Sequence, residues 1–320
     1  MDIDVAALAE ATSDGFRQDT AEKVYRLIGL LRELEAGDET RGKFTLKGGT
    51  ALNVFHQEGV PRLSVDIDIM ATGFPDAAAK SVPRERAVQL VIAAAKRQGY
   101  LIQRRDEGEA GCTLHCTYKN TLGAQDQIKV DIDLLNRQTL LPADMRQGPA
   151  LFFADDFRYP VVTAAELLGQ KLTAVAYRAH VRDLYDMHRM LDMGWHKHAR
   201  ARAMYLAYSF LHDAAWYRLD YPMKLAVPYA PDHLRDVLRT REEPPALDVI
   251  RDRAQTCLTE PPSYASASDD EKRSRDRILA GELAAFADIA GEPEPSRRAQ
   301  LALHPGVAWR VTQANRKQLR

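Results

Sequence analysis

The sequence predicts an α+β domain over residues 1–160, followed by a helical domain over residues 161–320. Two segments of the first half alternate apolar and acidic residues with a period of two, which is typical of half-buried strands. After Pro160 the apolar residues instead recur at helical spacing. With 320 residues, 45% of them hydrophobic, the chain is long enough to build two cores.

The elements expected in the first domain follow from these periodicities. Apolar residues at helical spacing predict a long helix over residues 5–34, ended by Gly37, and an amphipathic helix over residues 83–98. A Gly-Gly turn at Gly48 separates a short strand from a short helix. The expected strands cover residues 43–47, 62–70, 101–105, 112–118 and 127–135, and the short helix covers residues 51–55.

The second domain is expected to consist of helices throughout. Thr163 and Glu166 have the spacing of a capping box, as do Ser268 and Glu271. The first pair would open a helix with an apolar stripe, and the second a helix that continues to about residue 289. Further helices are expected over residues 182–193, 199–213, 230–239 and 248–257.

The composition argues against a membrane protein and against a small protein held together by disulfides. The chain has no apolar run of the roughly 18 residues that a membrane helix needs, and its first residues are acidic where a secretory signal is basic, so no membrane partner and a cytoplasmic location are expected. Three cysteines without a C-x-x-C pair argue against a disulfide framework. The net charge of −1 does not by itself predict a nucleic-acid partner. The basic tail from Ser296 onward is equally compatible with a phosphate-contacting arm and a solvated terminus.

Asp66 and Asp68 are the first candidates for a chemical role. They lie two residues apart on a predicted strand, so their carboxylates project from the same face. Two carboxylates this close repel each other, but the arrangement becomes favourable when a divalent cation lies between them. Oxygen ligands of this kind suit Mg²⁺ or Mn²⁺. If the second acidic strand lies beside the first, Asp131 supplies a third carboxylate, and two metals could then support an in-line displacement at phosphorus. The alternative is a solvated outer face of the sheet.

Gly48, Gly49 and Thr50 precede a predicted helix and could bind phosphate. Glycines let backbone N–H groups approach an anion, a helix N-terminus favours negative charge, and the Thr50 hydroxyl could donate a hydrogen bond. A Gly-Gly turn alone is more often structural. Its position shortly before the two acidic strands favours a shared nucleotide and metal site.

The motifs together resemble the AbiEii family, which includes the MenT toxins. The resemblance rests on K-G-G-T-A-L from Lys47, R-x-S-x-D-x-D from Arg62, I-K-V-D ending at Asp131, L-G-x-K-L around Lys171, and R-D-x-Y-D from Arg182. It implies a polymerase-beta-like nucleotidyltransferase domain, with a mixed sheet flanked by helices, and a helical C-terminal domain that completes the active site and contacts the acceptor. It also implies a toxin of a toxin–antitoxin system that uses an NTP and magnesium to modify RNA at the 3′ end of tRNA, together with a cognate antitoxin.

The resemblance also implies roles for single residues. Those implied to be catalytic are Asp66, Asp68, Lys171, Asp183 and Asp186. Those implied to bind metal are Asp66, Asp68 and Asp131. Those implied to bind nucleotide are Lys47, Gly48, Gly49, Thr50, Ser64, Lys171 and Arg182. Asp133 is expected to support the site or to be exposed.

Some of these assignments have alternatives. By its own sequence context, Lys171 would lay its stem over the edge of an apolar stripe and leave its charge in water. Asp183 and Asp186 share a helix face, and one of them could serve only to anchor Arg178 or Arg182. The alternative functions are transfer to a small molecule such as an aminoglycoside, transfer of AMP to a protein hydroxyl, and binding of nucleotide without catalysis.

Overall fold

The computed structural model describes residues 5–57, 59–74, 82–148, 150–152, 156–213, 232–259 and 267–318. The chain forms two compact units, Met1–Val162 with Asp232–Pro244, and Thr163–Pro231 with Pro245–Arg320. The sequence-based division at residue 160 did not foresee that Asp232–Pro244 packs with the first unit. There the Leu63 N–H donates to the Val237 carbonyl at 2.8 Å, and the Arg239 guanidinium binds the Asp14 carboxylate at 2.6 Å.

The first unit combines a mixed sheet with helices, as expected of an α+β fold. Its helical elements are α1 (Val5–Ser13), α2 (Gln18–Ala36), α3 (Gly48–Thr50), η1 (Ala51–His56), α4 (Val82–Arg97), η2 (Ala150–Phe152) and α9 (Asp232–Arg235). Its strands are β1 (Thr45–Lys47), β2 (Asp66–Met70), β3 (Leu101–Glu107), β4 (Gly111–Lys119), β5 (Gln125–Asp133), β6 (Asp144–Gln147) and β7 (Arg158–Val161). Strands β6 and β7 were not predicted, because four residues each are too few to establish a period.

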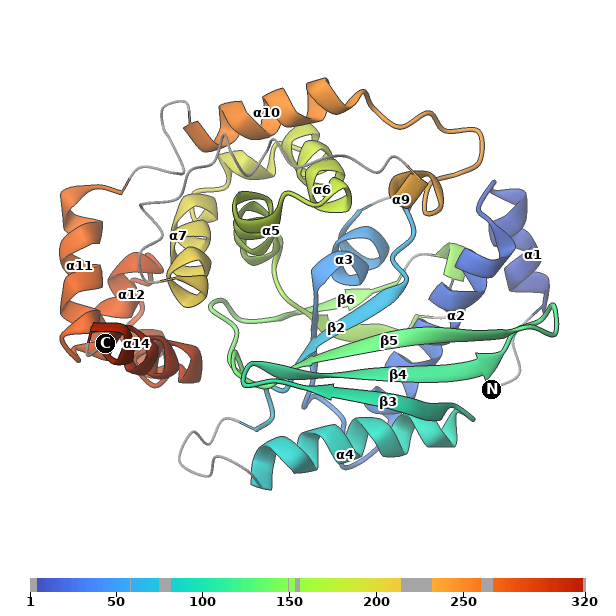
Figure 1. The fold of residues 1–320 in the computed structure, drawn as a ribbon, viewed down its shortest axis with the longest axis horizontal. Coiled ribbons are helices and arrows are strands. Elements are labelled where there is room, and N and C mark those ends of the chain that lie inside the picture. The colour runs from blue at the N-terminus through green and yellow to red at the C-terminus, as the bar shows by residue number, and fades with distance from the viewer. Residues whose placement is uncertain are drawn as a thin grey trace. The chain divides into compact units, whose positions relative to one another are not determined.

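The seven strands form one sheet in the order β3-β4-β5-β2-β1-β7-β6. Strands β3, β4, β5 and β2 lie side by side in Figure 1. The pairs β2–β5 and β1–β7 are parallel, and the other neighbouring pairs are antiparallel. The two acidic strands, β2 and β5, are therefore direct neighbours although about sixty residues separate them in the chain.

One face of the sheet is buried under helix α2. On β5, Ile128, Val130 and Ile132 are buried, whereas the alternate residues are partly exposed. Tyr118 of β4 is paired with Asp126 of β5, so its ring lies on the same face as these apolar side chains, and the Arg26 guanidinium of α2 stacks on that ring at 3.9 Å. Asp66 and Asp68 of β2, and Asp131 and Asp133 of β5, consequently project from the opposite face.

The helix expected over residues 5–34 is two helices. Helix α1 ends at Ser13 and α2 begins at Gln18, with Gly15 between them at φ +98°. An L-residue side chain rarely adopts this conformation, so the glycine permits the turn. Both helices contribute buried leucines, and for this reason the apolar periodicity continued across the break.

The second unit is helical throughout its described residues. Its elements are α5 (Ala164–Arg178), α6 (Val181–Asp192), η3 (Trp195–Lys197), α7 (Ala201–His212), α10 (Leu247–Thr259), α11 (Asp269–Leu279), η5 (Leu283–Ala285), α12 (Phe286–Ile289), α13 (Pro295–Ala302) and α14 (Pro305–Gln318). The Ser268–Glu271 capping box is present. Thr163 caps α5, but the Glu166 carboxylate accepts from the Tyr208 hydroxyl at 2.5 Å instead of closing the box. The helix expected to reach residue 289 ends at Leu279, and Gly281 follows it at φ +104°.

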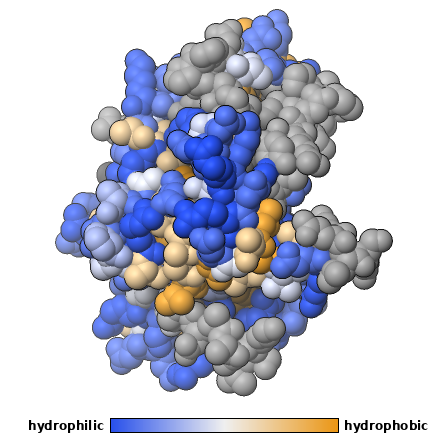
Figure 2. Space-filling view, turned by 90° about the vertical axis from the view of Figure 1, so that its left-hand side faces the viewer, coloured by the Kyte–Doolittle hydropathy of each residue, from blue (hydrophilic) through white to orange (hydrophobic). Residues whose placement is uncertain are grey.

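The surface combines charged side chains with scattered apolar ones. The face drawn in Figure 2 is mainly hydrophilic, with a smaller apolar band across it. The most exposed large apolar side chain of the described residues is Leu303, at 76%. None of the described helices is both long enough and apolar enough to span a bilayer.

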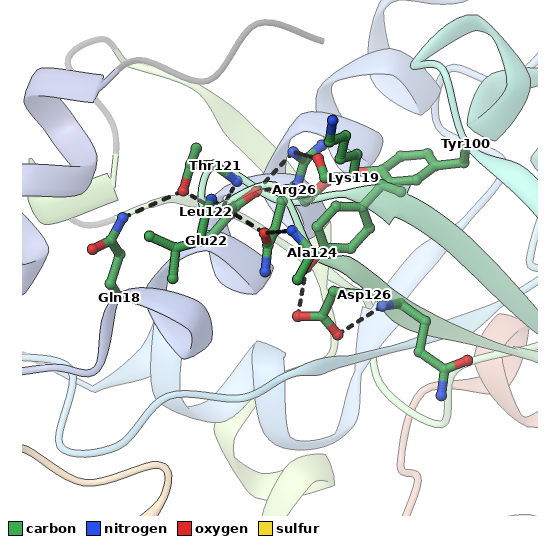
Figure 3. Close-up of polar contacts among 12 residues, drawn as sticks. Gln18, Glu22, Arg26, Tyr100, Lys119, Thr121, Leu122, Ala124 and Asp126 are labelled. Atoms are coloured by element: carbon green, nitrogen blue, oxygen red, sulfur yellow. Dashed lines mark hydrogen bonds and ion pairs between the residues drawn. The ribbon is translucent and has the colours of Figure 1, made fainter.

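A buried ion pair fixes α2 to the turn between β4 and β5 (Figure 3). The Glu22 carboxylate, 1% exposed, accepts hydrogen bonds from Arg26 at 2.7 and 2.9 Å, from the Thr121 N–H at 2.9 Å and from the Thr121 hydroxyl at 2.6 Å. Arg26 also donates to the Lys119 carbonyl at 3.2 Å. Because Glu22 and Arg26 of α2 both bind the segment Lys119–Thr121, the pair sets the position of the helix on β4 and β5.

We predict that Glu22→Ala lowers the free energy of unfolding by about 3–5 kcal/mol, because it leaves the Arg26 guanidinium buried without its carboxylate. Urea denaturation followed by circular dichroism measures the change. Glu10→Ala, at an exposed position of α1, is the control and should stay within about 0.5 kcal/mol of the wild type. A similar small loss for Glu22→Ala would show that the pair does not hold the helix.

Candidate functional site

The acidic residues of β2 and β5 lie side by side. The two strands pair in parallel with Asp68 opposite Asp131, and Asp66 opposite Lys129. Residues in register on neighbouring strands project from the same face, and the strands are about 4.8 Å apart. The condition set in the sequence analysis, that the second acidic strand lies beside the first, is therefore met, and Asp66, Asp68 and Asp131 lie on one face.

The glycines after β1 leave room for the residues that surround them. Gly48 has φ +71°, and a Cβ atom at this position would lie 2.0 Å from Asp68 Oδ2. A Cβ atom on Gly49 would lie 2.7 Å from Ser64 Oγ and 3.1 Å from Arg62 Nη2. The Gly-Gly turn is thus packed directly against Asp68 of β2 and against Ser64, which lies just before this strand.

Thr50 has a structural hydrogen bond in this arrangement. Its hydroxyl donates to the Asp66 carbonyl at 2.6 Å, and the residue is buried. This bond ties the end of α3 to the start of β2. The expected bond from Thr50 to phosphate stays a prediction, because the hydroxyl hydrogen is directed to the backbone here.

Lys47 joins the acids from the other neighbouring strand. It is paired with Asp68 across β1 and β2, and its ammonium nitrogen lies 2.5 Å from Asp133 Oδ2. Burial opposes the charge on Lys47, but Asp133, and then Asp68 and Asp131, raise the pKa of the ammonium group above its usual value. Lys47 is therefore protonated at neutral pH.

Asp133 is held in place by the backbone that follows it. Its Oδ1 accepts from the N–H groups of Leu135 at 3.1 Å and Asn136 at 2.8 Å, and its Oδ2 accepts from the Asn136 amide at 3.2 Å. The side chain is 11% exposed. Asp133 thus supports Lys47, and the alternative that it is simply exposed is wrong.

These residues line a cleft of about 440 Å³ on the first unit. Its described walls carry five carboxylates, from Asp68, Asp106, Glu107, Asp131 and Asp133, and the ammonium group of Lys47. The Thr113 hydroxyl donates to Asp131 Oδ1. Asp66 does not line the cleft. Within the described ranges, no three His, Cys, Asp or Glu side chains are arranged to hold one metal ion, and the predicted set of Asp66, Asp68 and Asp131 stays a prediction.

The second unit contains a separate buried charge cluster on α5 and α6. The Lys171 ammonium lies 2.7 Å from Asp186 Oδ2 and 3.1 Å from Asp183 Oδ1. Arg178 binds Asp183 through Nε at 2.7 Å and Nη2 at 3.2 Å. Burial would raise the pKa of Asp183, but Lys171 and Arg178 hold it far below its usual value.

This cluster corrects the reading of Lys171 as a partly solvated lysine. Lys171 is 7% exposed, and both carboxylates bind its ammonium group, so its charge is not in water. Asp183 does anchor Arg178, as the sequence allowed, while Asp186 binds Lys171. Arg182 lies at the start of α6, where its N–H donates to His180 Nδ1 at 3.4 Å. The catalytic and nucleotide-binding roles of Lys171, Arg182, Asp183 and Asp186 stay predictions.

A supporting role for Asp133 was among the expectations from the sequence, but Thr113 was missed. Asp133 binds Lys47, and Thr113 donates a hydrogen bond to Asp131. The hydrogen bond from Thr113 depends on the pairing of β4 with β5, in which Thr113 lies opposite Asp131. Such a register cannot be read from either strand alone.

Comparison with known proteins gives two matches of different weight. The model of the family described as nucleotidyl transferase AbiEii toxin, type IV toxin–antitoxin system, matches residues 29–308. The solved structure of MenT4, a nucleotidyltransferase toxin from Mycobacterium tuberculosis H37Rv, matches with a TM-score of 0.54 and 17% identity, over 98% of this chain and 99% of that chain. At this identity the second match shows the fold alone. No curated protein matches the chain.

The clash at Gly48 makes a prediction about activity. Gly48→Ala should reduce nucleotide transfer by about 100-fold, because the new Cβ atom displaces the Asp68 carboxylate. Gly42→Ala is the matched control, since Gly42 has φ +68° but a Cβ atom there would meet nothing within 4 Å. Both variants should lose about 1–2 kcal/mol of stability from the left-handed backbone. Equal activity of the two variants would mean that the space beside Asp68 is not needed.

The cluster around Asp183 makes a prediction about pH. Because the pKa of Asp183 is lowered on folding, its ion pairs stabilise the protein fully above the ordinary carboxyl value of 3.8, and this contribution is lost as the pH falls below it. Asp183→Asn should cost about 3–5 kcal/mol at pH 7. The difference in free energy of unfolding between wild type and variant should shrink by about 1 kcal/mol at pH 3. Urea denaturation across this pH range measures it, and a constant difference would contradict the assignment.

Proposed function

The chain belongs to the AbiEii family of type IV toxin–antitoxin nucleotidyltransferases, and from this premise we propose that it transfers a nucleotide from an NTP to RNA, with the 3′ acceptor end of tRNA as the acceptor. Such a tRNA could no longer be aminoacylated, so translation would stop. The enzyme is a nucleotidyltransferase by family. Our proposal goes beyond the family in naming RNA as the acceptor and a divalent cation as a requirement.

One observation carries the proposal. Asp68 lies opposite Asp131 in register, while Gly48 packs against the Asp68 carboxylate so closely that a Cβ atom would not fit. The Gly-Gly turn is therefore in direct contact with Asp68, and Asp131 lies on the next strand. A nucleotidyl transfer needs this combination, because the triphosphate and the cation that neutralises it bind together.

The donor set suits a divalent cation. Asp66, Asp68 and Asp131 offer oxygen donors from one face of two paired strands, and Mg²⁺ or Mn²⁺ prefers such ligands. We propose that these three residues hold the ion. When bound, it would neutralise charge on the triphosphate and favour ionisation of the attacking hydroxyl.

The remaining residues would position the substrate. Backbone N–H groups at Gly48 and Gly49 can approach a phosphate closely, because neither residue has a side chain. Ser64 lies beside Gly49, and its hydroxyl would donate a hydrogen bond to an oxygen of the triphosphate. Thr113 would keep Asp131 oriented through the hydrogen bond to Oδ1. The RNA 3′ oxygen would then form a bond to the α-phosphorus as the bond from the α-phosphorus to the bridging oxygen breaks, with pyrophosphate leaving.

The proposal implies a biological setting. We infer that a cognate antitoxin neutralises the enzyme and that it acts in the cytoplasm, where NTPs and tRNA are found. We also propose a division of labour: the unit around the sheet binds the nucleotide, and the helical unit completes the active site and contacts the acceptor. The buried Lys171, Asp183 and Asp186 would contribute from that unit.

The experiment incubates purified protein with each labelled NTP, MgCl₂ and total bacterial RNA, and resolves the products on a denaturing gel. We expect label in a tRNA-sized band, and a loss of at least about 100-fold for Asp68→Asn, because the substitution removes a ligand charge without changing its size. Asp144→Asn is the matched control. It makes the same change on β6, where the side chain is 44% exposed and outside the cleft lining.

Three results would contradict the proposal. Equal labelling by wild type and Asp68→Asn would show that the Asp68 carboxylate is not needed for catalysis. Label in a small molecule or in protein, with none in RNA, would replace RNA as the acceptor. Nucleotide binding without any turnover would replace catalysis by binding.

A further inference from the structure

Lys47 is the one basic side chain among the described residues that line the acidic cleft. Its neighbours there include Asp68, with which it is paired across β1 and β2, and Asp133, which it contacts at 2.5 Å. Asp131 is also close enough to add to the charge that surrounds the ammonium group. A single positive charge thus lies beside Asp68 and Asp131, two of the three carboxylates that we propose as ligands of a divalent cation.

The two partners of this ion pair differ in rigidity. Asp133 is fixed by two backbone N–H groups and the Asn136 amide. Lys47 projects from the last residue of β1 on a flexible four-carbon stem, directly before the Gly48–Gly49 turn. The lysine can therefore change partner while the aspartate stays in place.

We propose that Lys47 acts as a resident counter-ion that couples nucleotide binding to cation binding. In the free enzyme its ammonium group binds Asp133 and repels a divalent cation from Asp68 and Asp131. When a triphosphate reaches the Gly48–Gly49 turn, Lys47 exchanges Asp133 for a phosphate oxygen, and the acids accept the cation. Lys47 is thus a positioning residue, and this inference rests on the proposed function.

Electrostatics sets the size of the effect. Like charges a few ångströms apart repel each other even in bulk water, and the repulsion is twice as large when one of them is a divalent ion. Removal of the Lys47 charge should therefore tighten cation binding to the free enzyme by about tenfold or more. A lysine that only supported the fold would not have this effect.

The test measures Mn²⁺ binding directly, by the electron paramagnetic resonance signal of the free ion, with and without a non-hydrolysable NTP and with no RNA present. Lys47→Met and Lys47→Gln should bind Mn²⁺ about tenfold or more tightly than wild type when no nucleotide is present. Lys47→Arg keeps the charge and should stay near wild type. The gain in Mn²⁺ affinity caused by the nucleotide should be smaller in both neutral variants than in wild type.

Two controls separate this inference from the proposed function. Lys43→Met removes the same charge from a residue outside the cleft lining and should leave Mn²⁺ affinity unchanged. Asp68→Asn should abolish binding in every background. If Asp68→Asn abolishes binding but the neutral Lys47 variants bind no more tightly than wild type, the inference is overturned and the cation site stands. If no variant binds Mn²⁺ even with nucleotide, both are overturned.

Discussion

The parallel pairing of β2 with β5 is the constraint on which the candidate site depends. It places Asp68 opposite Asp131, and the period of two keeps Ile67, Ile69 and Val130 on the buried face. A slip of one residue would turn the acids into the core and the isoleucines into water, so the hydrophobic core itself fixes the register. The helix that covers this face is tied down by the buried Glu22–Arg26 pair. The same strand register therefore both buries the hydrophobic core and places the acids in this protein.

A second constraint is the crowding of charge and backbone in a small volume. Gly48 is required because the Asp68 carboxylate occupies the space of a Cβ atom, and Lys47 compensates part of the negative charge next to it. Lys171 does the same for Asp183 and Asp186 in the helical unit, where all three residues are buried. Both clusters pair lysine with two or more nearby carboxylates. The cluster on the sheet lines a cleft, which is why we assign the nucleotide to it.

Much of this arrangement was predictable from local patterns, and the failures have physical causes. Alternation around Asp66 and Asp131 gave both strands, their faces and their acids, and the ordered motifs indicated the family that the comparison then confirmed. The break at Gly15 was missed, because buried apolar residues lie on both sides of this glycine. The burial of Lys171, the ion pair of Asp133 with Lys47 and the hydrogen bond of Thr113 depend on tertiary partners, which no single segment specifies.

The most direct test of the central claim is a crystal structure with Mn²⁺ and a non-hydrolysable NTP, using the anomalous signal of the metal. We predict a peak within about 2.5 Å of carboxylate oxygens of Asp68 and Asp131, with the triphosphate against the backbone of Gly48 and Gly49. A nucleotide bound at another place, or a metal peak away from these carboxylates, would contradict the account. The same map would show whether Lys47 still contacts Asp133.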